Sequence, residues 1–272
     1  MKIGIIQLKV CKDKDINMKR ALDKILMLAH NGADMVVLPE MFNCPYENSY
    51  FPLYAEPDGG LCYSQLSECA KENRIYLVGG SMPEKDDSDR LYNTCYIFDR
   101  DGNKIGKHRK MHMFDIAVEG GQSFMESATL TAGNKVTVFD TEFGRIGAAI
   151  CYDFRFPELS RLMADKGAKV IIVPAAFNMT TGPAHWELLF RQRAVDNQVF
   201  SIGAAPARDY EASYISFGNS IAVSPWGDVI GRLDEHESEL LLDIDLSIVD
   251  KVRHQLPLIK HRRLDIYSLS EI

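Results

Sequence analysis

Short apolar runs alternate along the chain with longer segments in which apolar residues recur at helical spacing. The runs are typical of buried strands, and the longer segments are typical of helices that cover one face of a sheet. The expected strands are residues 3–8, 35–38, 75–78, 93–98, 103–109, 136–139, 145–151, 170–173, 199–205, 220–224, 229–232 and 240–244. The expected helices are residues 18–29, 61–73, 157–166 and 183–197. This alternation predicts an α/β fold.

Glycine and proline support these boundaries. Gly32 stands where a glycine commonly ends a helix, and Pro157 stands at the first turn of a helix. Asp101-Gly102 separates two expected strands and predicts a hairpin. No linker or low-complexity stretch interrupts the pattern, so we expect a single domain over residues 1–272, with a polar C-terminal tail.

A weak internal repeat refines the fold prediction. Residues 35–43 resemble residues 170–178, and the hairpin around Gly102 resembles a second one around Gly227. Two such halves can pack sheet on sheet with helices outside, which predicts a four-layer α-β-β-α sandwich of two mixed sheets. If the repeat is real, Glu40 and Ala175 occupy equivalent positions. The alternative is that apolar strands ending in proline simply look alike.

Composition narrows the class of protein. Hydrophobic residues make up 46% and charged residues 25%, as in globular proteins, and the formal net charge is −7. An acidic chain without a Lys/Arg block lacks the footprint of a nucleic-acid binder. No apolar run is long enough to span a membrane, and the N-terminus reads as a first strand rather than a signal peptide.

The six cysteines are scattered and form no C-x-x-C pair. Free thiols in a reducing cytoplasm are therefore expected. Cys151 differs from the others because a small, apolar strand leads into it and a helix opens shortly afterwards at Pro157. This layout can present a nucleophile at the end of a sheet, with backbone N–H groups free to face an oxyanion. The segment alone fits a buried structural thiol equally well.

A nucleophilic cysteine needs a base or a cation nearby. Glu40 ends an apolar strand, where ligands bind in open sheets, and Lys110 ends the second strand of the hairpin. By itself each residue also fits an ordinary strand end. His108 and His112 are too loosely spaced to indicate a metal site, and no Cys/His cluster completes one, so we expect no metal and no cofactor.

Three segments resemble the signature blocks of the nitrilase (carbon–nitrogen hydrolase) superfamily, and they occur in its order. They are residues 38–42 (LPEMF), 109–112 (RKMH) and 150–158 (ICYDFRFPE). The resemblance implies the α-β-β-α sandwich and a Glu-Lys-Cys triad, which falls on Glu40, Lys110 and Cys151. A second glutamate often found beside this triad matches Glu126.

Within the superfamily the chain is most similar to the ω-amidase branch. The segments that carry this likeness are residues 79–84, 110–116, 180–189, 193–199 and 201–209. The branch hydrolyses the terminal amide of 2-oxoglutaramate and 2-oxosuccinamate. Residues 119–122 (EGGQ) depart from the branch in a loop that lies near its active site, so the reaction class is better supported than the substrate.

The resemblance implies that Cys151 attacks the amide carbon while Glu40 moves the protons. Lys110 and the backbone N–H of Tyr152 would hold the oxyanion, and Glu126 would orient Lys110 or the water. Glu126 also fits a surface loop acid.

The expected partners are a small acid amide and water, without nucleic acid or membrane. The substrate carboxylate needs a cation, and Arg155 is the first candidate because guanidinium binds carboxylate bidentately. The alternative for Arg155 is a structural ion pair with Glu158 or Asp153. Further pocket candidates are Tyr152, Phe177, Asn178 and His185.

Two other functions remain open at this point. The first is another acid-amide, N-carbamoyl or deaminated-glutathione amidase of the superfamily. The second is a non-catalytic oligomeric scaffold, which the intact set of Glu40, Lys110 and Cys151 argues against. We expect the chain to form a homodimer or a larger homo-oligomer.

Overall fold

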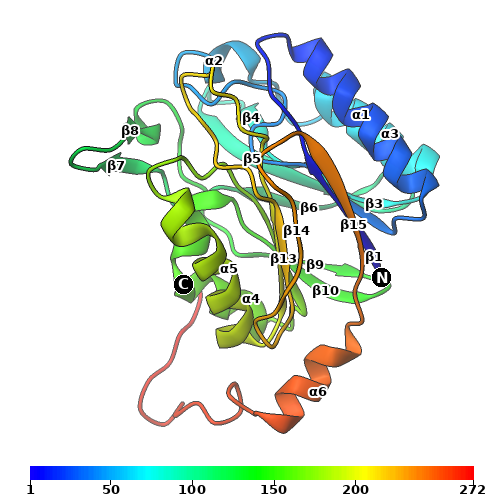
Figure 1. The fold of residues 1–272 in the computed structure, drawn as a ribbon, viewed down its shortest axis with the longest axis vertical. Helices are drawn as coiled ribbons and strands as arrows, with labels where there is room; N and C mark the ends of the chain where they lie inside the picture. Colours follow the sequence, from blue (N-terminus) through cyan, green and yellow to red (C-terminus); the bar gives the residue numbers. More distant parts are fainter.

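Two mixed β-sheets, each backed by helices, make up the computed structural model, which describes residues 1–272 (Figure 1). The first sheet has the strand order β15-β1-β2-β3-β5-β4, and β6 pairs with β5. Its strands are β1 (Lys2–Gln7), β2 (Met35–Val37), β3 (Tyr76–Val78), β4 (Met82–Lys85), β5 (Leu91–Phe98), β6 (Lys104–Arg109) and β15 (Ser238–Asp243).

The second sheet has the order β14-β13-β12-β11-β10-β9. Its strands are β9 (Thr137–Thr141), β10 (Gly144–Ala148), β11 (Val170–Pro174), β12 (Phe200–Ala204), β13 (Ile221–Val223) and β14 (Val229–Arg232). A separate hairpin of β7 (Asp115–Ala117) and β8 (Ser123–Met125) projects from one end of the sandwich (Figure 1).

Helices cover the outer face of each sheet. Helices α1 (Lys14–His30) and α3 (Leu61–Asn73) contact the first sheet, whereas α4 (Pro157–Asp165) and α5 (Gly182–Asn197) contact the second. This arrangement confirms the expected four-layer sandwich. Helix α2 (Phe51–Tyr54) is a single short turn, and α6 (Ser247–Gln255) follows β15. None of the helices is long and apolar enough to cross a bilayer.

Alternation along β1 shows how the sequence builds these layers. Ile3 and Ile5 belong to the large core between the sheets, while Ile6 belongs to a second core beneath α1 and α3. Gly4 also faces the helix, since a Cβ there would lie 2.9 Å from Cδ1 of Leu28 in α1. Successive side chains of a strand point to opposite faces, so an apolar run buried on both faces fills two cores.

Strand directions in the two sheets match. In each sheet three parallel strands are flanked by antiparallel ones: β1, β2 and β3 in the first, β10, β11 and β12 in the second. Glu40 follows the middle parallel strand of the first sheet and Ala175 follows that of the second. This correspondence agrees with the internal repeat.

The sequence pattern was wrong in two places. Strand β10 ends at Ala148, and Cys151 begins a 3₁₀ turn instead of ending the strand, because its backbone adopts a φ of +47°. The polar tail contains helix α6, whose Val249 and Val252 are buried. Strands β4, β7 and β8 and helix α2 were not expected, since each is too short to give a clear periodic pattern.

Candidate active site

The carboxylate of Glu40 is fully buried at the end of the first sheet that faces the Cys151 turn. Its Oε1 accepts hydrogen bonds from Lys110 Nζ (3.0 Å), Asn93 Nδ2 (2.8 Å) and the Tyr46 hydroxyl (3.3 Å). Its Oε2 accepts one from the backbone N–H of Ala176 (2.7 Å), which follows β11 of the second sheet. Glu40 is therefore held by both sheets.

The ammonium group of Lys110 lies between two carboxylates. Lys110 directly follows β6, and its backbone N–H donates to the Asn93 carbonyl in β5 (2.9 Å). Its Nζ lies 3.0 Å from Glu40 Oε1, 2.9 Å from Glu126 Oε2 and 3.0 Å from the Tyr46 hydroxyl oxygen. The side chain is fully buried, so this charge is matched by protein groups rather than water.

Glu126 is buried as well, which removes the interpretation of it as a surface loop acid. Its Oε2 accepts from the backbone N–H of Phe114 (2.7 Å), and its Oε1 accepts from the Tyr46 hydroxyl (2.9 Å). The structure thus joins Glu126 to Lys110 through the ammonium group and to Glu40 through Tyr46 and Asn93.

Cys151 lies at the start of a 3₁₀ turn and is only 3% exposed. A φ of +47° is unusual for a residue with a side chain, and such strain costs on the order of 1–3 kcal/mol. Strain of this kind persists only where neighbouring bonds fix the backbone. Here the Asp153 side chain and backbone both bond Ile150, the residue before Cys151.

Burial and neighbouring charge set the protonation of these groups. Burial raises the pKa of the Cys151 thiol well above its usual value, and the Glu40 carboxylate raises it further, although Lys110 opposes this. Burial also raises the pKa of Glu40, again against the effect of Lys110. Burial would lower the pKa of Lys110, but Glu126 and Glu40 outweigh it and raise that pKa. These shifts favour a protonated thiol beside a carboxyl group of raised pKa and a charged ammonium group.

This arrangement can perform nucleophilic chemistry. A protonated thiol needs a base to become a nucleophile, and Glu40 is the carboxylate whose charge acts on it most strongly. A fixed ammonium group can stabilise an oxyanion formed during attack. The other five cysteines are also free, but none lies beside Glu40 and Lys110.

Arg155 occupies the neighbouring wall, near Cys151 and Tyr152. Its guanidinium lies 4.5 Å from the Phe177 ring centroid, and its Nη1 donates to His185 Nδ1 (3.0 Å). Its Nε and Nη2 are buried without any hydrogen-bond partner. Arg155 forms no ion pair with Glu158 or Asp153, which was the alternative considered from the sequence. The Asp153 carboxylate instead accepts hydrogen bonds from His108 and His112. Burial lowers the pKa of Arg155.

Asn178 is placed differently from the other pocket candidates. Its Nδ2 donates to Gln122 Oε1 (2.5 Å) and its Oδ1 accepts from the backbone N–H of Thr181 (2.9 Å). Asn178 therefore ties the β7–β8 hairpin to the loop before α5. The structure brings Tyr152, Arg155 and Phe177 together through close ring and guanidinium contacts, with the exposed His185 at their edge.

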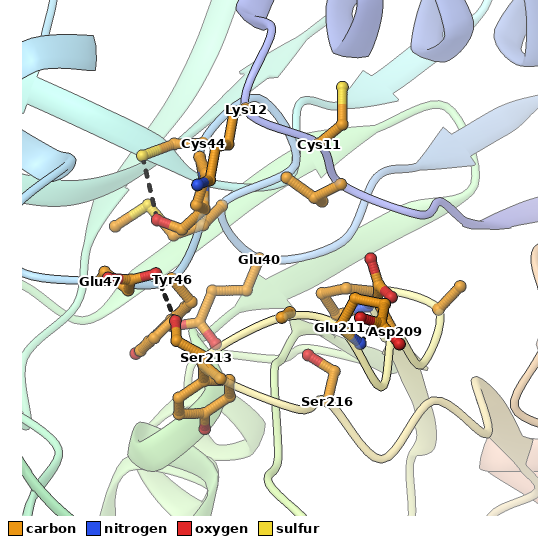
Figure 2. Close-up of a pocket in the computed structure, with 17 residues that line it drawn as sticks. Cys11, Lys12, Glu40, Cys44, Tyr46, Glu47, Asp209, Glu211, Ser213 and Ser216 are labelled. Atoms are coloured by element: carbon orange, nitrogen blue, oxygen red, sulfur yellow. Dashed lines mark hydrogen bonds between the residues drawn. The ribbon is translucent and has the colours of Figure 1, made fainter.

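A cavity of about 390 Å³ opens next to Glu40 (Figure 2). It is lined by loops that follow β1, β2 and β12, at residues 10–12, 41–47 and 206–216. Tyr46 and Tyr214 contribute to its wall together with Glu40, whereas Cys151 and Arg155 do not line it. The cavity therefore reaches the candidate base from a side where the candidate nucleophile is not exposed.

Sequence reasoning missed Tyr46 and Asn93. Asn93 shares its strand face with Cys95 and Ile97, which point into the core. A polar residue on that face needs a buried hydrogen-bond partner, and this could have identified Asn93 as part of a site. Tyr46 stands in an irregular loop, where no periodicity indicates the direction of a side chain. Burial and the nearby carboxylates raise the pKa of Tyr46, so it is a neutral hydroxyl donor.

The chain is similar in sequence to proteins of known family. The family model described as carbon-nitrogen hydrolase matches residues 2–254. The chain is 49% identical over 270 residues to omega-amidase NIT2 of Xenopus tropicalis, covering 99% of this chain and 98% of that protein. It is 47% identical over 268 residues to omega-amidase NIT2 of Homo sapiens, covering 98% and 97%.

Solved structures are also similar. Nit3 of Saccharomyces cerevisiae, a member of the nitrilase superfamily, superimposes with a TM-score of 0.89 at 41% identity, covering 97% of this chain and 96% of that one. A mutant amidase from Nesterenkonia, which carries acrylamide added at its active-site cysteine, has a TM-score of 0.78 at 25% identity, covering 94% and 98%. The chain therefore belongs to the carbon–nitrogen hydrolase family and is an amidase.

Proposed function

We propose that this amidase hydrolyses the ω-amide of a dicarboxylic acid monoamide, such as 2-oxoglutaramate or 2-oxosuccinamate, to the acid and ammonia. The observation that carries the proposal is the Lys110 ammonium group, held between Glu40 and Glu126 beside Cys151. The similarity to omega-amidases over nearly the full length supports the choice of substrate.

In the first half of the reaction Cys151 Sγ attacks the amide carbon while Glu40 takes the thiol proton. The raised pKa of Glu40 makes it a better acceptor for that proton. Lys110 and the backbone N–H of Tyr152 stabilise the oxyanion. Glu40 then gives its proton to the amide nitrogen, the C–N bond breaks, ammonia leaves, and a thioester remains on Cys151.

In the second half Glu40 takes a proton from water, whose oxygen attacks the thioester carbon. The C–S bond breaks, the acid leaves, and the Cys151 sulfur recovers its proton from Glu40. Glu126 keeps Lys110 in place through both halves, because it binds the same ammonium group from the other side. No metal or cofactor takes part in these steps.

Arg155 would bind the substrate carboxylate. Its buried and unpartnered Nε and Nη2 are two donors in a plane, which suit a carboxylate accepting two hydrogen bonds. Arginine can only donate, so His185 Nδ1 accepts from Nη1, and the other two groups remain free. Tyr152 and Phe177 would contact the carbon chain of the substrate, and Asn178 would act through the hairpin that it fastens.

The test is a substrate panel with ammonia detection. The purified chain is compared on 2-oxoglutaramate, glutamine and an N-carbamoyl amine, with a Cys151→Ala variant as the blank. We expect 2-oxoglutaramate to have the highest kcat/KM and the blank to be inactive. Preference for the N-carbamoyl amine, or for a glutathione-derived amide added to the panel, would reject the ω-amide assignment. The assignment of thiol-dependent C–N bond hydrolysis would still stand.

Three broader assignments accompany the activity. Residues 1–272 would form one domain, since a single core draws residues from Ile3 to Val249. Six free cysteines suit a reducing compartment, so we place the enzyme in the cytoplasm. Exposed apolar side chains such as Leu188 and Trp226 suit a homodimer or larger homo-oligomer, which light scattering would test.

A further inference from the structure

Asp153 is a fully buried carboxylate that takes no part in the steps above, yet it accepts hydrogen bonds from five N–H groups. Its Oδ1 accepts from the backbone of Met111 (3.1 Å) and His112 (2.9 Å) and from His112 Nδ1 (2.8 Å). Its Oδ2 accepts from the backbone of Ile150 (3.1 Å) and from His108 Nε2 (2.9 Å).

These donors come from two segments that are distant in the sequence. Met111 and His112 directly follow Lys110, whereas Ile150 directly precedes Cys151. One carboxylate therefore connects the chain beside the candidate oxyanion donor to the chain beside the candidate nucleophile. His108 adds a third connection, because it lies in β6 two residues before Lys110 and is fully buried.

We propose that Asp153 is a positioning residue that fixes Lys110 relative to Cys151, and that His108 holds Asp153 in place. This role presupposes amide hydrolysis at Cys151. It gives His108 and His112, which were weighed from the sequence as metal ligands and set aside, a role as donors to Asp153. No group of three or more His, Cys, Asp or Glu side chains is arranged to hold a metal ion.

The hydrogen-bond inventory supports a fixed, ionised Asp153. An ionised carboxylate only accepts, so all five N–H groups find an acceptor on it. His108 Nδ1 lies 3.0 Å from the Thr137 hydroxyl, which also lies 3.2 Å from the Lys107 carbonyl. Thr137 can satisfy the ring whether His108 is neutral or protonated. Burial alone would raise the pKa of Asp153, but the bonds from His108 and His112 lower it well below its usual range.

Asp153→Asn tests this role because the amide keeps the shape and changes the chemistry. An amide has one accepting oxygen and one donating N–H₂ group. If its oxygen faces the N–H groups of Met111 and His112, its N–H₂ group faces the N–H of Ile150, and two donors meet. In the reverse orientation the N–H₂ group faces the N–H groups of Met111 and His112, and donors meet there instead. His108 can move its ring proton, but a backbone N–H cannot. We expect kcat to fall about 10- to 100-fold with little change in KM, as for small misplacements of reacting groups. Alkylation of Cys151 by iodoacetamide, followed by mass spectrometry, should slow in parallel.

Asp34→Asn is the matched control. Asp34 also binds a backbone N–H, from Lys2 (2.8 Å), and a cationic side chain, Arg100 (2.9 Å), but it precedes β2 at the end of the sheet away from Glu40. This variant should lower the melting temperature and leave kcat and alkylation unchanged. If Asp153→Asn behaves in the same way, Asp153 is only structural and the proposal is overturned.

A pair of His108 variants keeps the proposal falsifiable if Asp153→Asn fails to fold. His108→Gln retains an N–H that can reach Asp153, so its kcat should stay close to that of the wild type, whereas His108→Leu should lose about tenfold or more. Equal activity of the two variants would overturn the role of His108. If the wild-type chain hydrolyses no amide but alkylation still slows in Asp153→Asn, the positioning role stands and the proposed function fails.

Discussion

The hydroxyl oxygen of Tyr46 lies 3.0 Å from Lys110 Nζ and 2.9 Å from Glu126 Oε1. Tyr46 thus bridges the buried cation and Glu126, and it also lies 3.3 Å from Glu40 Oε1. Tyr46→Phe removes the bridge without changing the ring that packs on Phe51 and Tyr214. A buried donor left without its partner costs about 1–3 kcal/mol, so we expect kcat to fall about 5- to 150-fold. Steady-state kinetics measure this loss, and unchanged kcat would show that Lys110 needs only the carboxylates.

Cys151→Ala should abolish turnover and leave the fold intact, because a small residue replaces a side chain at the floor of the site. Circular dichroism checks the fold and ammonia release checks the activity. The control is Cys95→Ala, which alters a fully buried thiol without the charged neighbours that surround Cys151. Amidase activity retained in Cys151→Ala would refute the thiol mechanism, and a second indispensable cysteine would point to a different chemistry.

Lys110→Arg keeps the positive charge, yet we expect a loss of about 10²–10³ in kcat, as when an oxyanion-hole donor is removed. The planar, longer guanidinium cannot occupy the fully buried position between Glu40 and Glu126. Lys107→Arg serves as the control, because Lys107 is part-exposed and lies in β6, the strand that Lys110 follows. Rates near the wild-type value for Lys110→Arg would show that Lys110 does not touch the reacting atoms.

Arg155→Met should raise KM for ω-amido acids far more than for neutral amides. Loss of a charge-assisted bidentate contact costs on the order of 2–3 kcal/mol, or about 30–150-fold. The measurement compares a charged and a neutral amide of the same length, with a melting curve alongside. If both substrates lose kcat equally and the protein melts earlier, Arg155 only braces the turn after Cys151.

The activity should also depend on pH through Glu40. Because burial raises the pKa of this carboxyl, it stays protonated in a range where an ordinary glutamate has ionised, and a protonated Glu40 cannot accept the thiol proton. The value of kcat/KM should therefore rise with pH through that raised pKa. Lys110 stays charged and Cys151 stays protonated well into alkaline conditions, so no fall is expected near pH 8.5, the usual pKa of a thiol. A fall there would indicate a thiolate at rest.

Much of the sandwich follows from local pattern. The apolar run at β2 and the helix at α3 appear where periodicity places them, because both bury a continuous apolar face. Glu40 and Cys151 stood out as candidates because each ends or follows such a run, but only the resemblance to the nitrilase superfamily favoured a catalytic role over a structural one. Helix α6 escaped notice because only Val249 and Val252 are buried on it, which is too little to give a visible stripe.

The partners of the candidate site could not be predicted in the same way. Asn93 contacts Glu40 because β5 pairs with both β3 and β6. The pattern of one segment does not encode the register of such pairs. Asp153 was considered as a partner of Arg155, two residues away, but the packing of the sheets brings His108 to it from a distant strand. Local pattern offers candidate residues at the ends of strands, while long-range pairing decides which charges face them.

The hydrogen bond from the Ala176 N–H to Glu40 Oε2 crosses from the second sheet to the first. Glu40 and Lys110 follow strands of one sheet, and Cys151 follows a strand of the other. A chain in which only one sheet has formed therefore carries either a base without a thiol or a thiol without a base. The reactive centre comes into existence only when the halves dock. A newly made chain is thereby spared an activated sulfur while its apolar surfaces are still open to other molecules.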